Sequence, residues 1–165
     1  MKWPKPVIED SYRYVLPIKV SEKKSELAVI QINPSLADGK RLDPTAGKVK
    51  KWAEEKGYGI VYLLNFFARI SSKQLEIKDQ GYSWVVGREN DYYISKIPLT
   101  SEIVIATGEP KGVLKKYYLK RKEEIKSILS DRKVQRVGRL SGGKYPRHGR
   151  SWNLDNRNLY PYDWN

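Results

Sequence analysis

Residues 26–45 read ELAVIQINPSLADGKRLDPT, and this stretch decides the fold. Its first part, from Leu27 to Ile32, is a nearly continuous apolar run, which is typical of a strand covered on both faces of a parallel sheet. The run ends at Asn33-Pro34, because proline has no N–H for a sheet ladder and disfavours helical geometry in the preceding residue. Ligands of open α/β sheets bind beyond the carboxyl ends of the strands, so the sequence predicts a strand that delivers a functional loop.

The rest of the chain alternates strand-like and helix-like segments. Thr45 is the expected cap of the helix that starts at residue 46, and Gly57 is its expected end. Pro17 makes its strand an edge strand or ends it there. The predicted strands are 12–18, 26–32, 60–65, 102–107 and 133–138, and the predicted helices lie at 46–56, between Gly87 and Pro98, and at 112–130.

Short connections between alternating strands and helices predict an α/β fold with three layers, helix, sheet and helix. The expected sheet is central, four-stranded and mainly parallel, with one additional N-terminal edge strand. A length of 165 residues predicts a single domain over 1–165 with a core of its own. Residues 1–11 are expected to form an extended arm, 12–152 the core and 153–165 a C-terminal tail.

Composition limits the chemistry and indicates a partner. The chain has no cysteine and only one histidine, His148, which excludes thiolate and histidine-rich metal sites, so any metal would need carboxylates. We expect no metal and no cofactor. Because no segment has the apolar length of a signal peptide or a membrane span, we expect a cytoplasmic monomer without membrane association. The formal charge of +13 favours nucleic acid, most simply DNA, as the partner.

Polar and aromatic side chains gather in the loops that follow the predicted strands. Amides can orient a water or a base edge, aromatic rings can stack on a base, and a histidine can stabilise developing negative charge. No spacing indicates a Ser-His-Asp triad, a Walker loop or a dinucleotide fingerprint. These side chains are Asn33, Ser35, Asp38 and Asp43 after the first buried strand, Asn65, Phe66, Phe67 and Arg69 after the second, and Lys144, Arg147, His148 and Arg150 in the late glycine-rich loop.

Several of these residues also have a structural explanation. Asn33 and Asn65 can cap strand ends, Phe66 and Phe67 can belong to the core, and Asp43 can cap a helix as part of Asp-Pro-Thr. For any one residue alone the structural explanation is the stronger. The order in which they occur, on a basic chain, favours a site.

Several segments resemble a known family in the same order. They are RYVL at 13–16, INPSLAD and DPT at 32–45, LLNFFAR at 63–69, GREND at 87–91, ATG at 106–108 and GKYPRHG at 143–149. Together they are similar to a bacterial and phage family catalogued as domain of unknown function sixteen-forty-three. That resemblance covers nearly the whole chain and implies no activity.

Three of these segments also resemble the loop motifs of uracil-DNA glycosylases, the mismatch-specific branch in particular. They are INPS at 32–35, LLN at 63–65 and PRHG at 146–149. This resemblance implies a glycosylase-like parallel sheet. The chain departs from the motifs where it has Asn33 in place of the Asp of the most active glycosylases, Ser35 in place of Gly or Tyr, and Gly149 in place of Pro.

The glycosylase resemblance implies a role for each residue. Asn33 would position the attacking water, Asp38 or Asp43 would serve as a base, and His148 would stabilise the leaving base. Base binding would fall to Asn65, Phe66, Phe67 and Ser35, and phosphate contacts to Arg69, Lys144, Arg147 and Arg150.

We therefore expect a DNA-binding protein that flips a damaged or modified base and hydrolyses its N-glycosidic bond without a metal. Two alternatives stay open. One is a non-catalytic nucleic-acid binder on the same fold, acting as a sensor or a phage-conflict factor. The other is an enzyme that acts on free nucleotides. Whether the protein is an enzyme at all depends on which of the three is correct.

Overall fold

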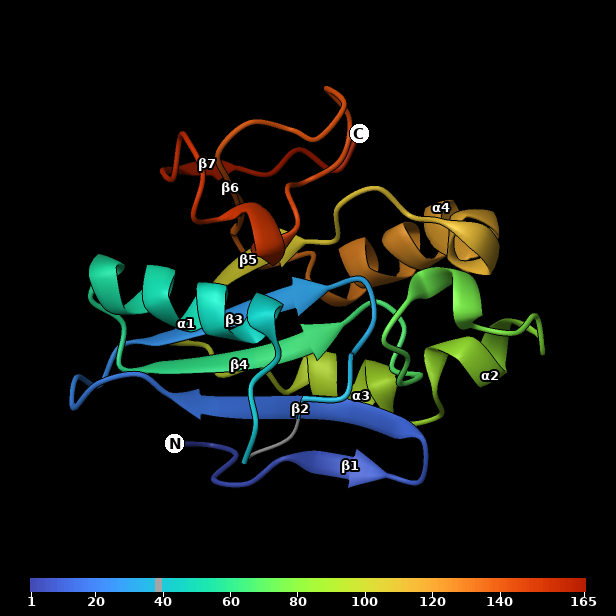
Figure 1. Ribbon diagram of the computed structural model, residues 1–165, viewed down its shortest axis with the longest axis horizontal. Helices are drawn as coiled ribbons and strands as arrows, with labels where there is room; N and C mark the ends of the chain where they lie inside the picture. The colour runs from blue at the N-terminus through green and yellow to red at the C-terminus, as the bar shows by residue number, and fades with distance from the viewer. Residues whose placement is uncertain (38–39) are drawn as a thin grey trace.

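A computed structural model describes residues 1–37 and 40–165, and in these residues one mixed sheet of seven strands forms the centre of the molecule (Figure 1). Its spatial order is β1-β2-β4-β3-β5-β6-β7. The neighbours β4, β3, β5 and β6 run parallel, whereas β1–β2, β2–β4 and β6–β7 are antiparallel pairs. The strands are β1 (Val7–Glu9), β2 (Tyr12–Lys19), β3 (Glu26–Gln31), β4 (Ile60–Asn65), β5 (Glu102–Ala106), β6 (Val134–Val137) and β7 (Leu159–Pro161).

This sheet corrects the predicted fold. A central, mainly parallel, four-stranded glycosylase-like sheet with one edge strand is wrong, because the described residues form seven strands and three of their six pairings are antiparallel. The expected arm and tail contain β1 and β7, which have three residues each and are too short to show an alternating pattern. The antiparallel partnership of β2 with β4 escaped prediction because the apolar pattern of a strand does not specify the direction of its neighbour.

Pro17 lies where β2 is the outermost strand. The pairing of β1 with β2 runs from Tyr12 to Val15, so none of the strands in the described part of the chain covers the outer side of β2 at Pro17. On its inner side, Pro17 is paired with Tyr62 of β4. The missing N–H of proline therefore leaves no partner unsatisfied.

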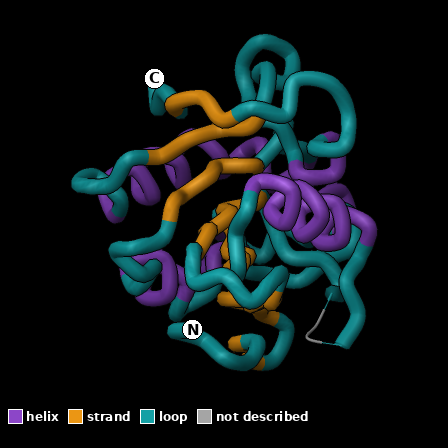
Figure 2. The backbone as a smooth tube through the Cα atoms, turned by 90° about the vertical axis from the view of Figure 1, so that its left-hand side faces the viewer, coloured by secondary structure: helices purple, strands orange, loops and turns teal. Residues whose placement is uncertain are grey.

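Helices cover both faces of the sheet (Figure 2). Helix α1 (Pro44–Lys56) packs Val49 and Trp52 on one face, and α2 (Tyr82–Val86), α3 (Asn90–Ser95) and α4 (Gly112–Ile128) pack on the other. Two single-turn helices, η1 (Gln74–Glu76) and η2 (Gly149–Ser151), lie in loops. Within the described part of the chain, no helix has the length and apolarity to cross a membrane.

The ends of α1 follow from its sequence, with one correction. Thr45 is not the cap of the helix; Asp43 is, as its structural explanation predicted, because the Asp43 side chain accepts a hydrogen bond from the N–H of Ala46 at 2.7 Å. Pro44 then occupies the first turn, where its missing N–H has no intrahelical partner to lose. Gly57 ends the helix as predicted, with a left-handed φ of 89°.

Candidate functional site

The carboxyl ends of the parallel strands meet at one edge of the sheet. Gln31 at the end of β3 is in register with Asn65 of β4 on one side and Ala106 of β5 on the other. The loops that follow β3, β4, β5 and β6 enclose a cavity of about 310 Å³ at this edge, which we call the main cavity. Its lining residues are Gln31, Ile32, Asn33, Ser35, Asp43, Thr45, Ser71, Ser72, Lys73, Gln74, Leu75, Lys111, His148 and Arg150.

Five of the residues predicted from sequence line this cavity. Asn33, Ser35 and Asp43 come from the loop after β3, and His148 and Arg150 come from the loop after β6. The two loops are more than 100 positions apart in the chain and meet here. Asp38, the other predicted carboxylate, lies outside the described residues.

Asn33 is held with a fixed amide orientation. Its Nδ2 donates hydrogen bonds to the backbone oxygens of Ser71 at 3.1 Å and Pro34 at 3.2 Å. With both donor positions used, the Oδ1 atom is the group that can accept a hydrogen bond from a molecule in the cavity. A fixed acceptor of this kind can hold a water molecule in one orientation by accepting a hydrogen bond from it.

The loop that carries Asn33 is anchored from β2. Arg13 is buried, and its Nη1 donates to the backbone oxygens of Ser35 and Ala37. The hydroxyl of Ser35 itself is buried and has no hydrogen-bond partner among the described residues. The RYVL segment of the sequence thus contributes a support for the site.

Glycines set the position of His148. The N–H of Gly108, directly beyond β5, donates to the backbone oxygen of Pro146 at 2.7 Å, and a Cβ added at Gly108 would lie 2.9 Å from His148 Cβ. On the other side, a Cβ added at Gly149 would lie 2.7 Å from Val49 Cγ2 of α1. The histidine loop therefore packs between β5 and α1 at a distance that only glycine permits.

Tryptophans hold the far end of the same loop. Trp152 is fully buried, and its ring centroid lies 4.8 Å from that of Trp52 on α1. Its Nε1 donates to the backbone oxygen of Arg147 at 3.2 Å. The backbone on either side of His148 is thus fixed by packing and by hydrogen bonds.

His148 is neutral at physiological pH. Burial lowers the pKa of its imidazole to about 4, with a further lowering by the charge of Arg150 that the Asp43 carboxylate opposes. Its Nδ1 accepts a hydrogen bond from the backbone N–H of Arg150 at 3.1 Å. The proton of the neutral ring therefore resides on Nε2, which makes Nε2 a hydrogen-bond donor.

This pKa predicts an acid-sensitive stability. Since His148 binds a proton near pH 6.5 when unfolded and near pH 4 when folded, its contribution is complete above pH 6.5 and is lost as the pH falls toward 4. Urea unfolding at pH 7.5 and pH 4.5 should show a stability loss about 2.5 kcal/mol larger in the wild type than in His148→Gln. The carboxylates titrate alike in both proteins, so equal losses would contradict the assigned pKa.

Close packing at Gly149 gives a second prediction. Gly149→Ala should lower the free energy of unfolding by about 1–3 kcal/mol, because the new methyl overlaps Val49. In a Val49→Ala background the same substitution should cost less than half as much, since the overlapping atoms are gone. Urea unfolding of the four proteins of this cycle measures the difference, and an equal cost in both backgrounds would locate the strain elsewhere.

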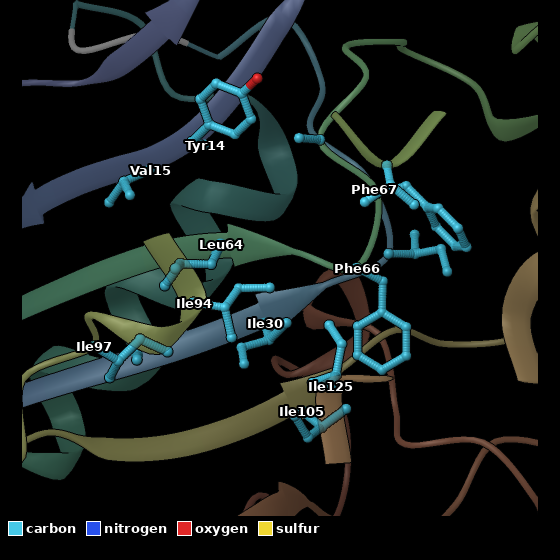
Figure 3. Close-up of a cluster of buried hydrophobic side chains, with 14 of the residues drawn as sticks. Tyr14, Val15, Ile30, Leu64, Phe66, Phe67, Ile94, Ile97, Ile105 and Ile125 are labelled. Carbon is cyan, nitrogen blue, oxygen red and sulfur yellow. The ribbon is translucent and has the colours of Figure 1, made fainter. Parts of the chain in front are cut away.

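The two predicted stacking residues lie in the core. Phe66 and Phe67 are fully buried in the cluster on the α2–α4 face of the sheet (Figure 3). Phe66 stacks on Tyr118 of α4, and their ring centroids are 5.5 Å apart. The chain after β4 turns back into this cluster instead of running into the solvent. Neither ring lines the main cavity.

Buried polar groups fix the end of β4. Asn90 donates from Nδ2 to the backbone oxygens of Asn65 and Phe66, both at 3.0 Å. Arg121 of α4 is fully buried and donates from Nε to the same Phe66 oxygen, while its Nη1 forms an ion pair with Asp91 at 2.6 Å. The GREND segment therefore supports the strand end that the site is built on.

The side chain of Asn65 lies beneath the site. It is fully buried, and neither its Oδ1 nor its Nδ2 has a hydrogen-bond partner in the described structure. Because residues in register point to the same face of a sheet, Asn65 shares the α1 face with Gln31, which lines the cavity. An unsatisfied buried amide costs about 1–3 kcal/mol, and a partner that enters beside Gln31 would remove this cost.

The predicted phosphate contacts are dispersed. Arg69 lies over the Trp84 ring at 4.2 Å, away from the cavity lining, and Lys144 lies over Tyr145 at 5.4 Å. Arg147 donates from both Nη atoms to the backbone oxygens of Asp155 and Asn156 and is largely buried. Of the four basic residues that the sequence selects, Arg150 alone lines the main cavity.

Sequence reasoning missed several lining residues. Gln31 is the one amide within the apolar run of β3, and that interruption was a usable signal. Lys73, Gln74 and Lys111 carried no signal, since isolated lysines and glutamines are common on the surface of a basic chain. No group of three or more His, Cys, Asp or Glu side chains that could hold a metal ion occurs among residues 1–37 and 40–165.

Comparison with known proteins gives the family. A family model described as a protein of unknown function (DUF1643) matches residues 13–149. The chain belongs to the DUF1643 family. The DUF1643 match includes every residue that lines the main cavity except Arg150. No curated protein and no solved structure matches the chain, so the resemblance to uracil-DNA glycosylases rests on its three short motifs.

Proposed function

We propose that this DUF1643 protein hydrolyses the N-glycosidic bond of a nucleotide whose base and sugar occupy the main cavity. The observation that carries the proposal is the pairing of a fixed amide acceptor, Asn33, with a neutral histidine donor, His148, in the lining of one polar cavity. Its volume of about 310 Å³ is at the lower end of the range for small-molecule sites.

The proposed roles follow from the hydrogen-bonding capacity of each group. Asn33 Oδ1 accepts a hydrogen bond from the water and aims the water oxygen at the anomeric carbon of the sugar. The bond from that carbon to the base nitrogen breaks, and the electron pair leaves with the base. The neutral imidazole of His148 carries its proton on Nε2. This Nε2–H donates a hydrogen bond to the developing anion and stabilises it. Asp43, one oxygen of which caps α1, has its second oxygen to accept the proton of the water.

Charge supports DNA as the source of the nucleotide. The net charge of +13 provides the electrostatic affinity that a nucleic-acid substrate needs. DNA that carries a damaged or modified base is therefore the first substrate to test. The protein would act on it as a monomer in which one chain supplies the whole cavity.

One observation favours free nucleotides as a second candidate substrate. No Phe, Tyr or Trp from the described part of the chain lines the main cavity. Proteins that capture flipped or unpaired bases commonly stack them on such rings. A free nucleotide, which pays no unstacking cost, has less need of a ring.

The test is release of free base from two sets of compounds. One set is single- and double-stranded oligonucleotides that carry uracil, hypoxanthine or hydroxymethylated pyrimidines, and the other is the corresponding nucleoside monophosphates. We expect release above background from at least one compound. Background release from both sets, together with tight and salt-dependent DNA binding, would instead make the protein a non-catalytic binder.

A further inference from the structure

A second, smaller cavity adjoins the main one on the side of His148. Its volume is about 130 Å³, it is the more enclosed of the two, and it shares Gln74, Lys111, His148 and Arg150 with the main cavity. We call it the side pocket. Most of its lining comes from the loops after β5 and β6, and the shared residues place it next to the site of the proposed chemistry.

Cationic groups dominate the side pocket. Lys111, Arg147 and Arg150 line it against a single carboxylate in its lining, that of Glu109. The described residues form no ion pair with Lys111 or Arg150, while Arg147 is paired with Asp155 at 3.6 Å. Lys111 and Arg150 are therefore not ion-paired within the described part of the chain, and the lining carries three cationic side chains against the one carboxylate of Glu109.

Arg147 supplies the group with an unmet hydrogen bond. Its two Nη atoms donate to the backbone oxygens of Asp155 and Asn156, but its Nε is buried and has no partner within the described structure. The side chain is 11% exposed. A buried guanidinium N–H without an acceptor is costly, and an anion in the side pocket would supply the acceptor.

We propose that the side pocket binds the phosphate monoester of the substrate nucleotide while the sugar and base lie in the main cavity. This inference rests on the proposed function and names its substrate class. Ser141 and Ser151 also line the pocket, and their hydroxyls are further possible donors to phosphate oxygens. The positive end of the α4 dipole, which begins beside Lys111, adds to the potential.

Enclosure favours a monoester over a phosphodiester. A phosphodiester continues into a sugar on both sides and needs a groove with two exits, whereas a monoester ends in the pocket. A monoester also carries a charge between about −1.5 and −2 at neutral pH, which matches the three cationic side chains of Lys111, Arg147 and Arg150 better than the single charge of a diester does. Free nucleotides and phosphorylated DNA ends both provide this group.

The test uses small phosphates, so that it is independent of the base. Calorimetric titration at constant ionic strength should show one saturable site for methyl phosphate and for inorganic phosphate, and at least tenfold weaker binding of dimethyl phosphate. Lys111→Gln and Arg150→Gln should each weaken methyl phosphate binding about tenfold or more. Lys115→Gln removes the same charge from an exposed lysine that lines neither cavity, and should change the affinity less than twofold.

Equal effects of Lys111→Gln and Lys115→Gln, or equal binding of the diester, would overturn the assignment. If the assignment holds, a competition experiment decides whether the phosphate monoester belongs to a free nucleotide or to a DNA end. It compares a nucleoside monophosphate with a 5′-phosphorylated oligonucleotide as competitors of methyl phosphate. Failure of phosphate binding, with base release intact in the wild type, would refute the side pocket alone. Retained phosphate binding without base release would refute the proposed hydrolysis and leave the pocket standing.

Discussion

Replacement of Asn33 by alanine is expected to reduce the rate of base release by about 100-fold or more, because the attacking water loses the acceptor that orients it. The substitution also removes the two hydrogen bonds to Ser71 and Pro34. Affinity for DNA should be unchanged within about twofold, since that affinity depends on lysine and arginine. Single-turnover base release and a DNA titration measure the two quantities.

Asn33→Asp is the informative partner of this variant. The resemblance to glycosylases would favour aspartate here as a stronger base. In the structure, however, the Nδ2 of Asn33 donates to two backbone oxygens, and a carboxylate would place a third oxygen against them. We therefore expect Asn33→Asp to be slower than the wild type. A faster Asn33→Asp enzyme would show that the amide is not oriented by these bonds.

Replacement of His148 by alanine is expected to have the second large effect, a fall in base release of about 100-fold to 1,000-fold. That is the usual result of removing one donor to a developing anion. Between pH 8 and pH 5 the wild-type rate should show no change caused by protonation of His148, because the pKa of His148 lies near 4. A pH–rate profile of wild type and variant checks both points.

Two outcomes would contradict the role of His148. One is a wild-type rate that falls with a midpoint near pH 6.5, which would mean an unperturbed imidazole in the working enzyme. The other is a rate for His148→Ala within about threefold of the wild-type rate, which would show that departure of the base does not depend on a hydrogen bond from His148.

Long apolar or periodic segments were predictable from the sequence. β3, β4 and β5 fall within or close to the predicted bounds, as do α1 and α4. Short elements were not predictable, because three residues of β1 or β7 show no periodicity and gain their stability from pairing with a longer strand. The mixed character of the sheet follows from these pairings, which involve residues that are distant in sequence.

The candidate site was predictable to the extent that strand ends mark it. Asn33 comes shortly after the buried strand β3, His148 lies in the loop after β6, and the structure brings both to one cavity. Phe66 and Phe67 also follow a strand, but their apolar rings return to the core, where burial of a large ring is worth more than exposure. Lys111 could not be singled out, because its significance comes from its position beside Arg147 and not from its own sequence context.

The central claim is hydrolysis of an N-glycosidic bond by water held in the main cavity. The most direct measurement is mass spectrometry of the products formed by the wild type in ¹⁸O-labelled water, on the best compound of the panel. We predict free base without label and a sugar fragment that carries one ¹⁸O atom at the anomeric carbon, when the sugar is reduced with borohydride as it forms so that its aldehyde cannot exchange oxygen with the solvent. Asn33→Ala should form both products more slowly than the wild type, by about 100-fold or more. Label on the base instead of the sugar, or no cleaved product from any compound, would contradict it.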